Sequence, residues 1–244
     1  KWVLRKYCGD CGKMRVQFVW ETKNYIDKYL HFHRVNIIEG WNSAVQYLED
    51  TPYAKIGKQI IENIIKDYEC FRIGKDLANS LIPHCLKLAT LDPIFRAGVG
   101  YESIGKVDAG DIEDMTRLLS ITKPEIFRAK KRMLLNPSFG RASMLVGGAD
   151  ADLIIDDTLI DIKTTKRASL NRPIFNQLMG YYVLEYISND YKSTINRLGV
   201  YFSRYGSLVT FPVSDVINTK TFYRFAKWFE DNYIDSNGVL HRSR

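Results

Sequence analysis

Long hydrophobic runs are missing from this sequence. No apolar run reaches the roughly 18 residues that a helix needs to cross a bilayer, and residues 1–16 lack the apolar segment of a signal peptide. These absences predict a cytoplasmic protein with no membrane partner. The pattern Gly-x-x-x-x-Gly-Lys-Ser/Thr is also missing, so we expect no ATP-driven motor in this chain. Any unwinding of nucleic acid would then require a helicase or another protein partner.

Cysteine is scarce, with four residues in 244: Cys8, Cys11, Cys70 and Cys85. In a reducing compartment these are expected as free thiols or metal ligands rather than disulfides. The segment CGDCGK, which contains Cys8 and Cys11, has the form of a zinc knuckle, but no second Cys-x-x-Cys completes it. Further Zn²⁺ ligands could come from His31 and His33 or from Cys70 and Cys85; alternatively, the two thiols stay free in a hairpin turn.

Positive charge and apolar residues are plentiful. The 35 Lys and Arg residues exceed the 28 Asp and Glu residues, which gives a net charge of +7. This sign favours anionic partners such as DNA. Hydrophobic residues make up 45% of the chain, enough for the core of a globular domain.

The patterning predicts an α/β protein with two domains. Residues 1–90 are expected to hold a β-hairpin (residues 2–7 and 14–20) and a mainly helical module, because apolar residues recur at steps of three and four over residues 56–68. Residues 91–244 alternate helical and strand patterns. In this part we expect helices over residues 111–120, 123–135, 173–188 and 220–233, and strands over residues 143–146, 153–155 and 159–162 and around residues 205–206.

The segment GGADADLIIDDTLIDIKTTK, residues 147–166, places charged residues among apolar strand residues. Side chains alternate along a strand, so Asp161 and Lys163 share one face. A two-residue loop, Asp156-Asp157 or Asp157-Thr158, would set Asp152 on that same face, and Asp150 has the same parity. A three-residue loop would move Asp152 to the opposite face.

Two carboxylates on one sheet face repel each other unless a divalent cation lies between them, and Mg²⁺ or Mn²⁺ suits such oxygen ligands. A lysine beside them can contact a phosphate under attack and stabilise its developing charge. This set of groups is able to hydrolyse phosphodiesters. The other interpretation is a hairpin whose polar face is simply exposed to solvent.

The longer pattern resembles the PD-(D/E)xK nuclease superfamily, in particular its RecB-like and phage-type exonuclease branch. The matching elements are GADADLII (residues 148–155), DIKTT (residues 161–165) and QLMGY (residues 177–181). The resemblance implies a restriction-endonuclease-like core, a small mixed sheet flanked by helices. It also implies that Asp152 and Asp161 bind the metal and that Lys163 acts on water and phosphate. Gln177 and Tyr181, four residues apart on one helix face, would position the substrate or the lysine.

The family's motif usually has an earlier Glu or His; here Glu102 resembles its Gly-x-x-x-Glu form, with Glu113 and Glu125 as rivals. The choice between Asp150 and Asp152 also stays open, although the apolar strand begins directly after Asp152. An iron-sulfur cluster of the kind found in some relatives is not expected, because all four cysteines precede the predicted catalytic strands.

Basic residues flank the predicted site on both sides and could hold the phosphate backbone of DNA without reading its sequence: Lys130, Lys131, Arg132, Lys166, Arg167 and Arg172. The sequence therefore predicts a Mg²⁺-dependent deoxyribonuclease, exonuclease or endonuclease, suited to phage replication, DNA repair or antiviral defence. The alternative is a catalytically silent subunit that binds nucleic acid or supports an assembly.

Overall fold

The computed structural model describes residues 2–5, 17–20, 51–72, 78–91, 101–146, 148–188, 195–234 and 240–242. The chain divides into two compact units, Lys1–Arg128 and Ala129–Arg244. The predicted domain boundary between residues 90 and 91 stays a prediction. Within the described parts of both units, no helix combines the length and the apolar character needed to cross a membrane.

The first unit contains a strand pair and a group of helices. Strands β1 (Trp2–Arg5) and β2 (Gln17–Trp20) pair antiparallel, as the sequence predicts. Helices α2 (Ala54–Arg72) and α3 (Ala78–Ala89) confirm the expected helical module. They pack through a repeating apolar face, with Ile60, Ile64 and Leu81 among its buried residues. Helix α5 (Ala109–Ile121) and the 3₁₀ turns η1 (Tyr101–Ser103) and η2 (Pro124–Phe127) follow.

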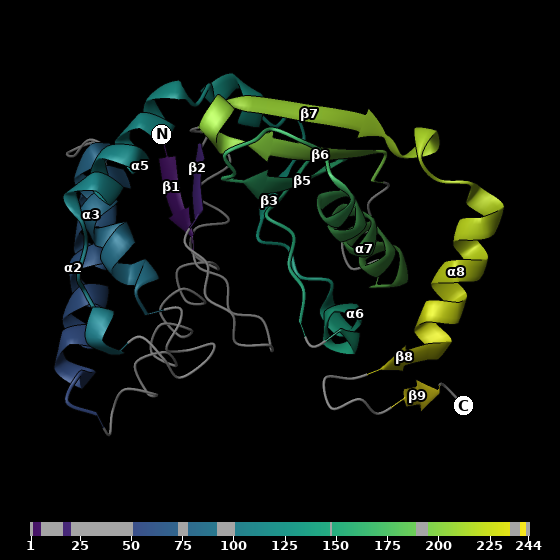
Figure 1. The fold of residues 1–244 in the computed structure, drawn as a ribbon, viewed down its shortest axis with the longest axis horizontal. Helices are drawn as coiled ribbons and strands as arrows, with labels where there is room; N and C mark the ends of the chain where they lie inside the picture. Colours follow the sequence, from purple (N-terminus) through teal and green to yellow (C-terminus); the bar gives the residue numbers. More distant parts are fainter. Residues whose placement is uncertain are drawn as a thin grey trace. The chain divides into compact units, whose positions relative to one another are not determined.

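The second unit is built on a five-stranded sheet, in the order β3-β4-β5-β6-β7. Its strands are β3 (Met133–Leu135), β4 (Leu153–Ile155), β5 (Thr158–Lys163), β6 (Arg197–Phe202) and β7 (Ser207–Pro212). Only β5 and β6 run parallel; the other neighbours are antiparallel. Parallel strands need a long crossover, and helix α7 (Arg172–Ser188) supplies it (Figure 1). The expected α/β class and mixed sheet are therefore confirmed.

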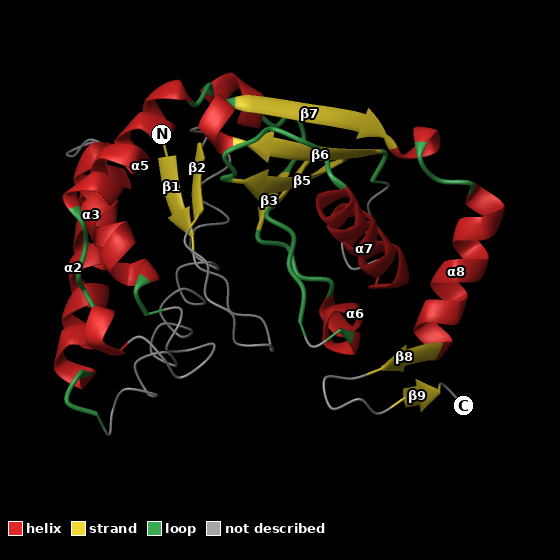
Figure 2. Cartoon of the chain, in the orientation of Figure 1, coloured by secondary structure: helices red, strands yellow, loops and turns green. Residues whose placement is uncertain are grey.

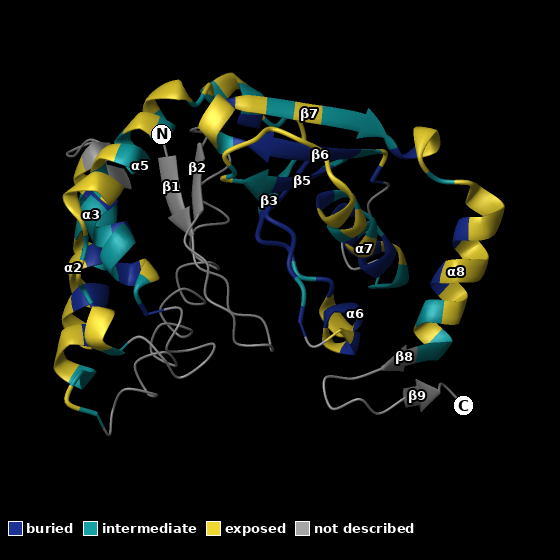
Figure 3. Ribbon diagram, in the orientation of Figure 1, coloured by how far each residue is buried: buried dark blue, intermediate teal, exposed yellow. Residues whose placement is uncertain are grey.

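The core of this unit lies between the sheet and α7. Leu159 of β5, Leu198 of β6 and Leu178 of α7 are fully buried in one apolar cluster. Figure 3 shows β6 buried along its length, whereas α8 (Thr219–Asp231) exposes much of its surface. Helix α8 packs on α7 through Phe222 and Val183. The remaining elements are α6 (Gly140–Leu145), η3 (Ser203–Tyr205), η4 (Val213–Asp215), β8 (Asn232–Ile234) and β9 (Leu240–Arg242).

Two predictions in this region were wrong. Residues 143–146, expected as a strand, lie mostly in helix α6, labelled in Figure 2. Phe139, directly before this short helix, and Ala142 and Leu145 within it are buried, and their spacing of three residues puts them on one side of the helix. Residues 123–135, expected as one helix, form the turn η2, an irregular segment and strand β3. Strand β3 pairs along its whole length with β4, and this pairing overrides the helical pattern.

Candidate active site

A tight turn sets the geometry of the site. Strands β4 and β5 pair through Leu153 with Ile160 and Ile155 with Thr158, so Asp156 and Asp157 alone form the loop. Asp156 has φ 54°, a left-handed conformation that Asp tolerates better than most residues. The predicted two-residue connection is thus confirmed.

The carboxylate of Asp156 fixes this turn to the preceding segment. It accepts main-chain hydrogen bonds from Lys130 (3.0 Å), Lys131 (2.7 Å) and Arg132 (3.1 Å). Burial raises the pKa of the Asp156 carboxyl, but these three N–H groups and the charge of Lys130 together lower it below its ordinary value. The hairpin is therefore anchored by a carboxylate that stays ionised.

The two predicted metal-binding carboxylates lie directly before β4 (Asp152) and within β5 (Asp161), on one sheet face. Continuing the β4–β5 register by one pair places Asp152 opposite Asp161. The main-chain N–H of Ile162 donates to Asp152 Oδ2 at 2.6 Å, which shows that the Asp152 side chain reaches β5. Asp152 is 2% exposed and Asp161 is fully buried. Directly opposed residues on neighbouring strands have Cβ atoms about 5 Å apart, close enough for both carboxylates to share one cation.

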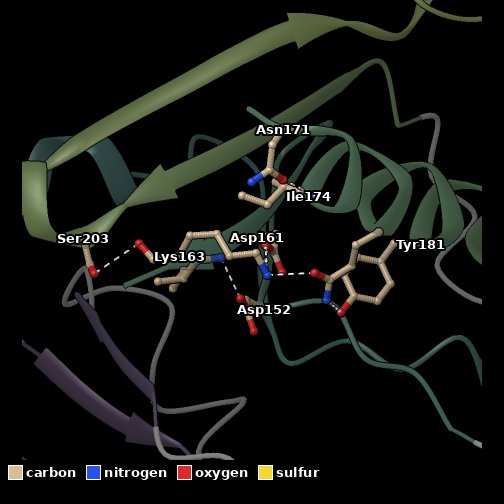
Figure 4. A network of polar contacts seen from close by, with 9 residues as sticks. Asp152, Asp161, Lys163, Asn171, Ile174, Tyr181 and Ser203 are labelled. Atoms are coloured by element: carbon tan, nitrogen blue, oxygen red, sulfur yellow. Dashed lines mark hydrogen bonds and ion pairs between the residues drawn. The ribbon is translucent and has the colours of Figure 1, made fainter. Parts of the chain in front are cut away.

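A series of polar contacts links Asp161 to helix α7 (Figure 4). Lys163 Nζ lies 2.7 Å from Asp161 Oδ2 and donates a hydrogen bond of 2.7 Å to Gln177 Oε1. Gln177 Nε2 in turn donates to the Tyr181 hydroxyl at 2.6 Å. Because an ammonium only donates, this arrangement fixes which end of the Gln177 amide faces the lysine. The four side chains that the sequence singled out are brought together in one series.

Local structure explains why the series forms. Gln177 and Tyr181 are one helical turn apart on α7, so both face the sheet. The first turn of α7 is held by Asn171, whose side-chain oxygen accepts from the Ile174 N–H at 3.1 Å. The end of β5 is held by Ser203, whose hydroxyl contacts the Lys163 carbonyl at 3.4 Å. The sequence analysis did not identify Asn171 or Ser203; the position of Asn171 two residues before Pro173 is a helix-start signal that could have found the first.

The donor set of this site suits a hard divalent cation. Asp152, Asp161 and Lys163 together carry one net negative charge, and both carboxylates are buried. Mg²⁺ is held in proteins by one or two carboxylates, with water and substrate phosphate completing its shell. Among the residues that the structure describes, no group of three or more His, Cys, Asp or Glu side chains could hold a metal.

The other acidic candidates differ in their surroundings. Asp150 is 5% exposed and forms an isolated bridge with Ser138. Glu102, Glu113 and Glu125 are exposed, and all three belong to the first unit. Glu113 forms an ion pair with Arg117 on its own helix at 2.5 Å. The identity of an upstream acidic ligand stays a prediction.

The basic residues fall into two groups. Lys130, Lys131 and Arg132, expected on a helix, lie instead in an irregular segment before β3, where the Asp156 carboxylate binds their main-chain N–H groups. Their helical placement was wrong, although their side chains remain available at or near the surface. Lys166, Arg167 and Arg172 are all exposed; the first two lie between β5 and α7, and Arg172 is the first residue of α7. This second group therefore lies on the segment that leads from Lys163 into helix α7.

The possible zinc site concerns residues outside the described part of the chain. Cys8, Cys11, His31 and His33 all lie there. Cys70 and Cys85 are free cysteines of helices α2 and α3. Burial raises the pKa of the Cys85 thiol, which disfavours the thiolate that zinc requires.

Comparison with known proteins adds no family to this geometry. No protein-family model matches the chain, and neither the curated proteins nor the solved structures contain a significant match. The functional argument accordingly depends on the fold and site described above.

Proposed function

We propose that this chain is a metal-dependent nuclease that hydrolyses DNA phosphodiester bonds. The observation that carries the proposal is the juxtaposition of two buried carboxylates, Asp152 and Asp161, with the ammonium of Lys163 on one sheet face. Burying two carboxylates side by side costs folding free energy unless a cation compensates their charge, and such sites are often functional. In a nuclease site the two carboxylates would bind a divalent cation and the ammonium would contact the phosphate. The fold is compatible with a nuclease core of the PD-(D/E)xK kind.

The roles of the residues follow from their contacts. Asp152 and Asp161 would bind Mg²⁺ through their carboxylate oxygens. When bound, the ion supplies Lewis-acid activation of the phosphate and lowers the pKa of water. Lys163, whose side chain is one-fifth exposed, can donate from Nζ to a phosphate oxygen and stabilise charge as the water–phosphorus bond forms and the phosphorus–oxygen ester bond breaks. Gln177 keeps Nζ directed into the site, and Tyr181 keeps Gln177 in place.

Substrate binding can use the exposed cations beside the site. Lys166 and Arg167 lie shortly after the end of β5, Arg172 is the first residue of α7, and all three are exposed. Cations of this kind bind phosphates without reading bases. A basic surface beside an acidic metal site is what a nuclease acting on the DNA backbone requires.

The test is incubation of the purified chain with labelled DNA carrying free or blocked ends, in Mg²⁺, Mn²⁺ or EDTA. We expect cleavage in either metal and none in EDTA. Cleavage of only free-ended DNA identifies an exonuclease, whereas cleavage of both identifies an endonuclease. Absence of cleavage with every metal, despite tight DNA binding, would refute the proposal.

One observation favours a second candidate. The ammonium of Lys163 already neutralises Asp161 at 2.7 Å, so this pair is stable without a metal. A catalytically silent subunit that binds nucleic acid could keep the pair as a structural ion pair. The metal titration separates the two candidates, because a silent subunit gains neither cleavage nor thermal stability from Mg²⁺.

A further inference from the structure

Helix α8 exposes an aromatic side chain among basic residues. Residues 220, 224, 227, 228 and 231 recur at helical steps and so lie on one face. That face carries Lys220, Arg224, Lys227, Trp228 and Asp231. The side chain of Lys227 is 78% exposed, and Trp228 is 56% exposed. Three cations and one carboxylate give this face a net charge of +2.

The exposed rings of Phe225 and Trp228 do not belong to the side of α8 that packs in the core. Helix α8 meets α7 through its opposite side, where Phe222 and Ala226 are buried beside Val183. Trp228 lies on the other side of the helix from Phe222 and Ala226. Its ring lies 6.0 Å from that of Phe225, which is itself 46% exposed. An indole with this exposure offers a flat surface for another ring system.

Two kinds of occupant fit this face poorly. An interfacial membrane helix separates its apolar and cationic faces, whereas here Trp228 shares its face with Lys220, Arg224 and Lys227, and the apolar side is occupied by α7. A second copy of the chain would bring the same net positive face against itself, and the centres of protein interfaces are depleted in charge. An exposed aromatic ring beside cations suits a ligand that carries both bases and phosphates, because the ring can stack on a base and the cations can bind phosphates.

We propose that this face of α8 binds single-stranded nucleic acid, with Trp228 stacking on an unpaired base and with Lys220 and Arg224 contacting phosphates. Stacking needs an accessible base face, which a duplex does not offer along its length. Helix α8 packs on α7, the helix that carries Gln177 into the candidate active site (Figure 1). In naming the strand state of the substrate, this inference rests on the proposed function.

The experiment measures binding without cleavage. A fluorescein-labelled oligothymidylate of about 20 nucleotides and a duplex of equal length are titrated with protein in EDTA, and fluorescence anisotropy gives both affinities. We expect Trp228→Ala to weaken single-strand binding by about tenfold or more and duplex binding by much less. Trp228→Phe should retain most of the affinity. Arg224→Ala should weaken the binding of both DNA forms and reduce the slope of log affinity against log salt concentration by about one.

Controls make each outcome decisive. Met144→Ala, at a 60% exposed side chain on α6, should bind like the wild type. Unchanged single-strand affinity in Trp228→Ala overturns the inference, as does sedimentation with anionic phosphatidylserine vesicles that depends on Trp228. If the wild type binds single strands through Trp228 yet never cuts, the proposed function fails and this inference stands. If the wild type cuts while Trp228→Ala binds and cuts normally, only this inference fails.

Discussion

Replacing Lys163 with alanine separates metal binding from chemistry. The substitution leaves both carboxylates in place but removes the ammonium that lies 2.7 Å from Asp161 and 2.7 Å from Gln177. We therefore expect Lys163→Ala to keep its affinity for Mg²⁺ and DNA while losing turnover. A group that stabilises charge mainly in the transition state contributes on the order of a hundredfold in rate, about 2.7 kcal/mol.

The same substitution should destabilise the metal-free protein. Asp161 is fully buried, and Lys163 is one-fifth exposed, so losing their contact leaves buried charge without its cation. We expect a loss of about 2 kcal/mol of stability, which is within the range for a hydrogen bond to a charged group and below the range for breaking a fully buried ion pair. For a chain of this size, that is a fall in melting temperature of about 4–8 °C. Mg²⁺ should raise the melting temperature of the variant, as it does for the wild type, because it binds the same carboxylates in both.

The assay pairs single-turnover cleavage with thermal melts in EDTA and in Mg²⁺. Lys58→Ala, at an exposed lysine of α2, is the matched control and should change neither measurement. A Lys163→Ala variant that cuts DNA at the rate of the wild type would refute the assigned role. A variant whose melting temperature is equally low with and without Mg²⁺ would refute the shared cation site.

Four further outcomes are expected. Asp161→Asn should lose Mg²⁺ binding, measured by calorimetry, together with cleavage, and retained activity would exclude Asp161 as a ligand. Gln177→Ala should reduce turnover by only about tenfold, because it positions Lys163 indirectly; a loss as large as that of Lys163→Ala would contradict this. Asp156→Asn should be less stable than the wild type above pH 3.8, and the difference should vanish as pH falls through the lowered folded pKa, so a constant difference down to pH 2 in denaturation curves would contradict the anchoring role. If Cys8 and Cys11 bind zinc, metal analysis should find about one Zn²⁺ per chain, lost in Cys11→Ser, whereas zinc-free protein of equal stability would exclude the site.

Much of the candidate site could be predicted from local rules. Side-chain alternation along β5 and a two-residue turn were enough to place Asp152, Asp161 and Lys163 on one face. A spacing of four residues was enough to pair Gln177 with Tyr181. These inferences succeed because they depend on neighbours within one hairpin or one helix.

Predictions failed where distant partners choose between conformations. The run Ser143 to Val146 is too short to distinguish a strand from a helix by periodicity. In the structure, burial of Phe139 and the hydrogen bond from Ser143 Oγ to the Ala149 carbonyl at 2.6 Å accompany the helical form. Likewise, Lys130 and Lys131 follow a helical pattern but donate their main-chain N–H groups to Asp156, 26 and 25 residues away.

The sequence by itself determined the strand alternation, the tight turn and the helical repeat, because these depend on sterics and on spacing along the chain. Only the tertiary structure decided that Lys163 of β5 meets Gln177 of α7, since that contact depends on the parallel pairing of β5 with β6 and on how the crossover helix packs on the sheet. The tertiary structure also decided which side of α8 is buried. Packing of Phe222 against Val183 fixes that side and leaves Trp228 exposed, a distinction that hydrophobicity alone does not make.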